Sequence, residues 1–185
     1  MFQVRIHGRG GQGVVTAAEM MSVAAFHEGR HAQAFPSFGS ERMGAPVVAF
    51  CRIDKKEIRS REPVMQPDAV IILDPTLLHS VDVFDGLAPD GYVLLNTSRA
   101  LDELGIDGLK EKFPPGHVRT IEATELALTH VGKPIPNAAL LGGFAAITRV
   151  IDLEAVSAAI KQKFPGQIGD KNIAAATAAF KAASA

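Results

Sequence analysis

Apolar and polar residues alternate at the start of the chain and then give way to a wider spacing. Phe2, Val4 and Ile6 alternate with polar neighbours, which predicts a β-strand. From 14 to 27 apolar residues recur every three to four positions among good helix formers, and Gly29 follows where a helix stop belongs. We therefore predict a strand, a glycine-rich turn and a helix, in that order.

The alternation of strands and helices continues to residue 136. Further strands are predicted at 31–35, 47–53, 69–73, 92–95 and 117–121. Helices are predicted to begin near Pro75 and Thr124. Because several of the strands are almost wholly apolar, they are typical of a sheet covered on both sides. The sequence thus predicts an α/β, Rossmann-like fold: a largely parallel sheet with helices on both faces and a helical C-terminal segment.

The last part of the chain has no strand signal. Helices are predicted at 138–151, 153–163 and 173–183, the second with Asp152 as its N-cap. The third is so rich in alanine that it suits close packing against a neighbour, either in this domain or in another chain. We predict one domain over 1–185, with a β/α sheet core at 1–136 and a helical part of the same domain at 137–185.

Length and charge narrow the classes of function. The chain has 185 residues, 47% of them hydrophobic, which is enough for a sizeable core. Its formal net charge of −1 provides no basic field for nucleic acid. Its apolar runs fall far short of the ~20 residues that a membrane span needs. We expect a cytoplasmic protein that binds neither nucleic acid nor membrane.

The stretch GRGGQG, residues 8–13, follows the first strand and opens the first helix. It satisfies G-x-G-x-x-G, a pattern in which glycines allow close backbone approach and the helix start attracts a phosphate. A tight turn without a ligand is the alternative. A nicotinamide site also needs an acidic residue at the tip of the second strand, where this chain has Pro36 and Ser37. A phosphorylated ligand other than NAD fits better.

A second glycine- and proline-containing loop, FPSFGSERMGAP at 35–46, supplies polar and charged groups. Ser37, Ser40, Glu41 and Arg42 make it a site candidate, and a rigid surface crossover is the alternative. Catalytic chemistry is not evident elsewhere, so we assign no catalytic and no metal-binding residue. The single cysteine, Cys51, lies in an apolar run and predicts an inert, buried thiol. His7 fits a hydrogen-bonded structural role better than contact with a ligand.

Taken together, GRGGQGVVTAAE and AQAFPSFGSERMGAPVVAFCRID resemble the gamma subunit of the 2-oxoacid:ferredoxin (pyruvate:ferredoxin) oxidoreductases, over essentially the whole chain. The resemblance implies a multi-subunit enzyme that oxidatively decarboxylates pyruvate or a related branched or aromatic 2-oxo acid to acyl-CoA and CO2. It implies thiamine diphosphate, Mg and [4Fe-4S] clusters in partner alpha, beta and delta subunits. Electrons would pass to ferredoxin or to an NAD-reducing subunit, and the gamma chain would help to bind coenzyme A.

Carried onto this sequence, the resemblance implies a set of coenzyme A contacts. The loop would approach the pantetheine or pyrophosphate, with Gln12 as a polar contact and Arg42 as the cation for a phosphate. Asn137, which opens the helical part, would face the same cleft. Met43 and Ser40 stand where a second arginine and a proline are frequent in the family, which weakens phosphate contact from this loop. The implied coenzyme A set is Gly8, Arg9, Gly10, Gly11, Gln12, Gly13, Ser37, Arg42 and Asn137.

Two other functions stay open at this point. One is a free-standing NAD(P)- or flavin-binding Rossmann oxidoreductase, and the other is a purely structural subunit. Because a full catalytic set is not evident, we expect the chain alone to be inactive. The sequence does not identify the 2-oxo acid or the electron acceptor.

Overall fold

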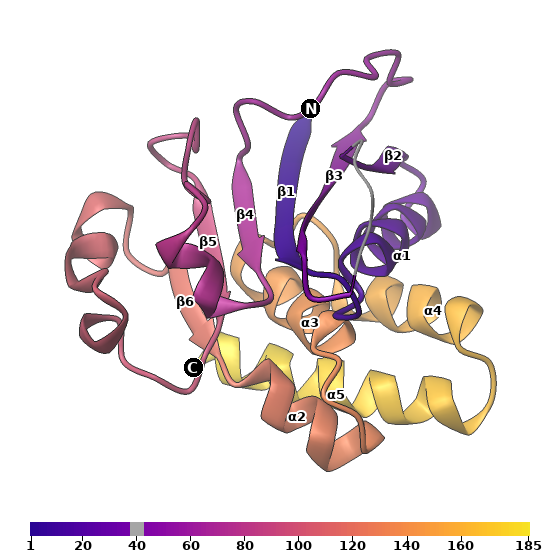
Figure 1. Ribbon diagram of the computed structural model, residues 1–185. Helices are drawn as coiled ribbons and strands as arrows, with labels where there is room; N and C mark the ends of the chain where they lie inside the picture. Colours follow the sequence, from indigo (N-terminus) through magenta and orange to yellow (C-terminus); the bar gives the residue numbers. More distant parts are fainter. Residues whose placement is uncertain (38–42) are drawn as a thin grey trace.

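The computed structural model describes residues 1–37 and 43–185. A six-stranded sheet with the order β2-β3-β1-β4-β5-β6 forms its middle (Figure 1). The strands are β1 (Phe2–Arg9), β2 (His31–Pro36), β3 (Pro46–Asp54), β4 (Ala69–Ile72), β5 (Tyr92–Asn96) and β6 (Val118–Ile121). The pairs β1–β4, β4–β5 and β5–β6 are parallel, whereas β3 runs antiparallel to both β1 and β2. In this sheet only β3 is reversed, so the prediction of a largely parallel sheet is confirmed.

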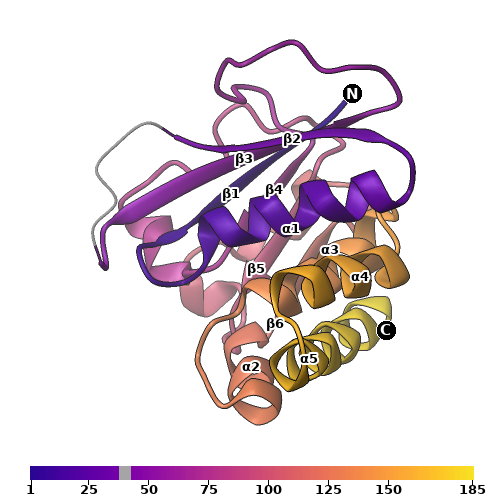
Figure 2. The ribbon, with the colours of Figure 1, turned by 90° about the vertical axis from the view of Figure 1, so that its right-hand side faces the viewer.

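Helices cover both faces of the sheet. The α-helices are α1 (Val14–His27), α2 (Ala123–Val131), α3 (Asn137–Thr148), α4 (Leu153–Lys163) and α5 (Gln167–Ser184). Figure 2 shows α1, α3, α4 and α5 stacked on one side of the sheet. Short 3-10 helices cover the other side, namely η1 (Pro75–His79), η2 (Asp102–Leu104) and η3 (Asp107–Lys112). A helix does begin at Pro75 as predicted, but it is the short 3-10 helix η1.

Strand β4 shows why both faces are covered. Successive side chains of a strand point to opposite faces, so a wholly apolar strand needs a core on each side. Ala69 and Ile71 join the large core under the α-helices. Val70 and Ile72 join a smaller core with Leu77 of η1. The apolar runs noted in the sequence thus reflect burial on two faces.

The alanine-rich helix α5 packs within this domain. A Cβ atom added at Gly142 of α3 would lie 1.9 Å from the carbonyl oxygen of Ala176, so the two helix backbones are in direct contact. Ala175, Ala176 and Ala179 are almost completely buried. The first of the two alternatives for this helix is therefore the correct one.

The ends of two C-terminal helices differ from the prediction. Helix α5 begins at Gln167 instead of 173 and includes Gly169, where an added Cβ would lie 2.0 Å from the carbonyl oxygen of Phe164. Because Gly169 has no side chain, the first turns of α5 can approach the end of α4 closely. Helix α3 ends at Thr148 instead of 151, because Arg149 has a left-handed backbone with φ of 53°.

Asp152 caps α4 as predicted, since its Oδ1 accepts a hydrogen bond of 2.7 Å from the backbone N–H of Ala155. We expect Asp152→Ala to lower the free energy of unfolding by about 1 kcal/mol, the usual cost of losing an N-cap. Urea denaturation of the two chains measures the difference. Asp152→Asn retains a capping oxygen and should recover most of the loss, and equal losses for both variants would contradict a capping role.

Within residues 1–37 and 43–185, none of the helices is both long enough and apolar enough to span a bilayer.

Candidate functional site

The glycine loop lies where the chain leaves neighbouring parallel strands toward opposite faces of the sheet. After β1 the chain passes through residues 10–13 into α1, on the α-helical face. After β4 it enters η1, on the other face. In open α/β sheets such a switch point, at the carboxyl ends of the strands, is where ligands bind. The topology therefore places the loop at the expected position for a binding site.

The loop presents the start of α1 to this edge. Gly11 and Gly13 have φ of 92° and 81°, conformations that side chains other than glycine rarely adopt. Gly13 is the N-cap residue of α1 and contributes no side-chain cap to its first turn. Since the first N–H groups of a helix have no intrahelical acceptor and carry a partial positive charge, this end suits an anion.

Two of the loop glycines are required by packing inside the chain. A Cβ at Gly8 would lie 2.5 Å from Cγ2 of Val14, and one at Gly13 would lie 2.4 Å from Nδ2 of Asn137. At Gly11 a Cβ would instead meet the exposed side chain of Met43, at 2.8 Å from its Cε. Gly11 is thus the loop glycine whose added side chain would project toward the outer surface.

The structure brings the two sequence motifs together. The N–H of Gly10 donates to the carbonyl oxygen of Ala45 at 2.9 Å, and the N–H of Gly44 donates to the carbonyl oxygen of Gly10 at 3.1 Å. Ser37 lies at the end of β2, two strands away from β1, and its N–H donates to Val48. Arg42, together with Ser40 and Glu41, lies outside the described residues.

Asn137 joins the start of α3 to the loop. Its side chain is 3% exposed, and its Nδ2 donates to the carbonyl oxygen of Gly13 at 3.5 Å. Its Oδ1 accepts from the N–H of Ala138 at 2.8 Å. The starts of α1 and α3 are therefore adjacent, and contact of Asn137 with a ligand stays a prediction.

Gln12 and Arg9 both contact Asp74, the residue that follows Leu73 at the end of β4. Gln12 accepts from the backbone N–H of Arg9 at 2.7 Å through Oε1 and donates to Oδ2 of Asp74 at 2.8 Å through Nε2. Nε of Arg9 lies 3.3 Å from the same Oδ2. Gln12 therefore braces the loop, and its contact with a ligand stays a prediction. Sequence reasoning missed Asp74, although the carboxyl ends of parallel strands meet at one edge.

Asp74 is ionised at neutral pH. Partial burial by itself raises the pKa of this carboxyl, but hydrogen bonds from Thr76 and Gln12 and the charge of Arg9 outweigh it and hold the pKa below its usual value. The negative charge of Asp74 offsets the positive charge of Arg9. The Arg9 guanidinium is also held in place by hydrogen bonds to Gly44 and Thr76.

His7 and Cys51 are structural. His7 is 3% exposed and accepts a hydrogen bond of 3.1 Å from Nε of Arg5 through Nε2. Burial, with the adjacent Arg5 charge, lowers the pKa of His7 to about 4, so its imidazole is neutral. Burial raises the pKa of Cys51 to about 12, which makes its thiol inert. Both sequence-based interpretations are confirmed.

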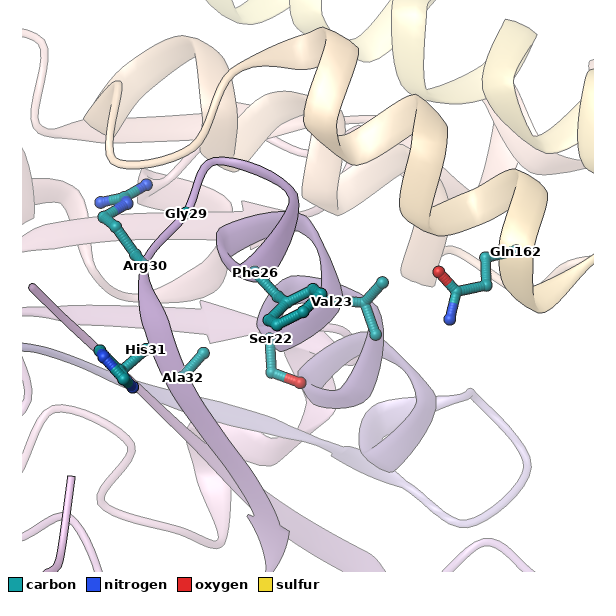
Figure 3. Close-up of a pocket in the computed structure, with 8 residues that line it drawn as sticks. All are labelled: Ser22, Val23, Phe26, Gly29, Arg30, His31, Ala32 and Gln162. Carbon is teal, nitrogen blue, oxygen red and sulfur yellow. The ribbon is translucent and has the colours of Figure 1, made fainter. Parts of the chain in front are cut away.

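A separate groove of about 560 Å³ lies at the opposite edge of the sheet. Figure 3 shows its lining from the end of α1, the start of β2 and Gln162 of α4. Phe26 is 74% exposed beside it. Because β2 starts at this edge, the groove lies away from the glycine loop and contributes nothing to the site at the carboxyl edge.

The chain thus folds as an α/β domain whose glycine loop leads into the start of α1 at the carboxyl ends of the strands, and its described residues hold no cluster of metal-ligating side chains. The chain belongs to the pyruvate ferredoxin/flavodoxin oxidoreductase family, whose model matches residues 3–182.

Relatives of known name cover nearly the whole chain. The pyruvate/ketoisovalerate oxidoreductases common subunit gamma of Pyrococcus abyssi is 49% identical, over 98% of this chain and 96% of its own length. Pyruvate synthase subunit PorC of Methanothermobacter marburgensis is 47% identical, over 98% of this chain and 97% of its own. The crystal structure of pyruvate oxidoreductase subunit PORC from Thermotoga maritima matches with a TM-score of 0.80 and 35% identity, over 97% and 95% of the two chains. The predicted resemblance to gamma subunits of 2-oxoacid oxidoreductases is confirmed.

Proposed function

We propose that this chain is the gamma subunit of a thiamine-diphosphate-dependent complex that converts a 2-oxo acid to acyl-CoA and CO2, and that its glycine loop contributes to the coenzyme A site. Alpha, beta and delta subunits would hold thiamine diphosphate, Mg and [4Fe-4S] clusters and pass electrons to ferredoxin or NAD. Coenzyme A supplies the thiol that accepts the acyl group. The work of this chain is then binding.

The observation that carries the coenzyme A part is the loop itself. Gly11 and Gly13 have left-handed backbones, and the helix start beyond them has no side-chain cap from Gly13, so a phosphate or amide of coenzyme A has N–H donors to approach. The proposed contact set is Gly8, Arg9, Gly10, Gly11, Gln12, Gly13, Ser37, Arg42 and Asn137. Of these, Gly8 and Gln12 support the loop from within, and Asn137 holds it against α3.

Strand order favours coenzyme A over a dinucleotide. In a nicotinamide site the second strand lies next to the first, so that an acidic residue at its tip meets the ribose. Here β3 lies between β2 and β1 and runs in the opposite direction. The tip of β2 ends in Pro36 and Ser37, two strands from the loop, without a carboxylate. Coenzyme A needs no such ribose clamp at that position.

The test is steady-state kinetics of the assembled complex with Gly11→Val. Valine at a φ of 92° is strained and would project over the loop, so the KM for coenzyme A should rise about tenfold or more. The KM for the 2-oxo acid should stay near the wild-type value, because in this proposal the other subunits bind that substrate. Arg42→Ala should raise the KM for coenzyme A about ten- to a hundredfold, the loss typical of a hydrogen bond to a charged group.

Gly108→Val is the matched control. Gly108 lies in η3, and nothing within 4 Å would meet an added Cβ. This variant should leave both Michaelis constants unchanged. If Gly11→Val and Arg42→Ala also leave them unchanged, the loop is a structural turn and the chain only braces the complex.

A further inference from the structure

The loop, the second motif and the end of β4 meet in one hydrogen-bonded cluster, centred on Asp74. β4 pairs with β1 in parallel, and the N–H of Leu73 donates to the carbonyl oxygen of His7 at 2.8 Å. Asp74, one residue later, therefore lies beside the point where β1 becomes the glycine loop. Its side chain is 15% exposed.

Both carboxylate oxygens of Asp74 are engaged. Oδ1 accepts from the backbone N–H of Thr76 at 2.9 Å and from its hydroxyl at 2.6 Å. Oδ2 accepts from Nε2 of Gln12 at 2.8 Å and lies 3.3 Å from Nε of Arg9. The carboxylate thus joins the β4–η1 turn to two residues of the loop.

Arg9 extends the cluster to the second motif. Its Nη1 donates to the carbonyl oxygen of Gly44 at 3.1 Å, and its Nη2 donates to Oγ1 of Thr76 at 3.0 Å. Since the hydroxyl of Thr76 donates to Asp74, its oxygen is free to accept from Arg9. The Arg9 guanidinium is therefore held beside the start of the glycine loop, here called the loop mouth, by acceptors on the second motif and on the β4–η1 turn.

Gln12 connects Asp74 to the backbone of the glycine loop. Its Oε1 accepts from the backbone N–H of Arg9 at 2.7 Å, and its own backbone N–H donates to the carbonyl oxygen of Arg9 at 3.1 Å. Two hydrogen bonds between Arg9 and Gln12 thus hold the turn, and Nε2 of Gln12 links the turn to Asp74. Gly13 and the start of α1 follow this turn directly, so the conformation of the turn sets the orientation of their N–H groups.

From this cluster we propose that Asp74 is a positioning residue: it holds the glycine loop through Gln12 and keeps the Arg9 guanidinium at the loop mouth, so that the loop is already shaped when its anionic ligand arrives. Asp74 acts through Gln12 and Arg9, because both of its carboxylate oxygens are already engaged within the chain. That the ligand is coenzyme A rests on the proposed function, whereas the effect of Asp74 on the loop does not.

Hydrogen–deuterium exchange of the assembled complex without coenzyme A tests the positioning directly. In Asp74→Ala, amides in peptides covering 8–17 should exchange about ten- to a hundredfold faster than in wild type, because charge-assisted bonds that hold the turn are lost. Asp74→Asn keeps an acceptor oxygen and should give a smaller increase. Peptides covering α4 should be unchanged in both, which shows that the fold persists.

Asp90→Ala is the matched control, since Asp90 is an exposed aspartate at the other edge of the sheet. Its loop exchange should equal that of wild type. Unchanged exchange of 8–17 in both Asp74 variants would overturn the proposal, as would equal increases over the whole chain.

Kinetics of the same complexes separates this inference from the proposed function. A higher KM for coenzyme A in Asp74→Ala, with the KM for the 2-oxo acid unchanged, supports both. Faster loop exchange with both Michaelis constants unchanged supports the positioning role of Asp74 and contradicts coenzyme A as the ligand of the loop.

Discussion

Replacing Gly142 by valine is expected to lower the free energy of unfolding by at least about 3 kcal/mol. Overpacking of a core costs about 1–3 kcal/mol when side chains can shift, but here the obstacle is the backbone of α5, with the carbonyl oxygen of Ala176 1.9 Å from the added Cβ. Helices α3 and α5 would have to separate, which opens the core between them. For a domain of this size the melting temperature should fall by about 6–12 °C.

Gly142→Ala and Gly108→Val provide the comparison. Alanine improves helix propensity by about 1 kcal/mol, yet its Cβ meets the same carbonyl, so this variant should still be destabilised. Gly108→Val should unfold near the wild-type midpoint because the space around Gly108 is open. Urea unfolding of wild type and the three variants measures these differences, and a Gly142→Val chain as stable as wild type would show that α3 and α5 do not pack as described.

The second large effect is a loss of stability in mild acid that depends on His7. The pKa of His7 is lowered from about 6.5 in the unfolded chain to about 4 in the folded one, chiefly by burial. Between these values the unfolded state binds the proton and the folded state does not, so stability falls as the pH falls. At about 1.36 kcal/mol per pKa unit, the loss between pH 6.5 and 4 amounts to roughly 3 kcal/mol.

Arg5 explains why the folded chain resists this proton. Its Nε donates to Nε2 of His7, which must stay unprotonated to accept, and its Nη2 donates to the carbonyl oxygen of Val83 at 3.1 Å. Chemical unfolding at pH 7.5 and 4.5 measures the effect. His7→Gln should show a smaller loss on acidification than wild type, and the exposed His79→Gln serves as the control. An equal loss in His7→Gln and wild type would refute the assignment to His7.

Much of the fold could be predicted because local spacing decides it. The bounds of α1 and α4 agree with the prediction, since good helix formers end at Gly29 for the first and Asp152 caps the second. The reversal of β3 was not predicted, although the signal was present. Only residues 37–45 separate β2 from β3, which is too short for the crossover that parallel strands need.

The candidate site was predictable in part. The loop glycines follow from a motif in the sequence and Asn137 from the family resemblance, and the structure brings Gly13 and Asn137 together. Asp74 escaped because its bond to Gln12 joins residues 62 positions apart, and which strand lies beside β1 is not readable from spacing. The resemblance implies Gln12 as a ligand contact, and only its bonds to Arg9 and Asp74 reveal that it also braces the turn.

The reversal of β3 also separates the sheet from the chain segment that borders the glycine loop. A β2–β3 hairpin places its connection at the same edge as the glycine loop, and Gly10 is hydrogen-bonded to Gly44 and Ala45 at the end of that connection. The connection can therefore gain, lose or exchange residues while the paired strands keep their alignment. The segment beside the glycine loop is in this way separable from the strands that carry it, and a change there would alter the surroundings of the loop without disturbing the register of the sheet.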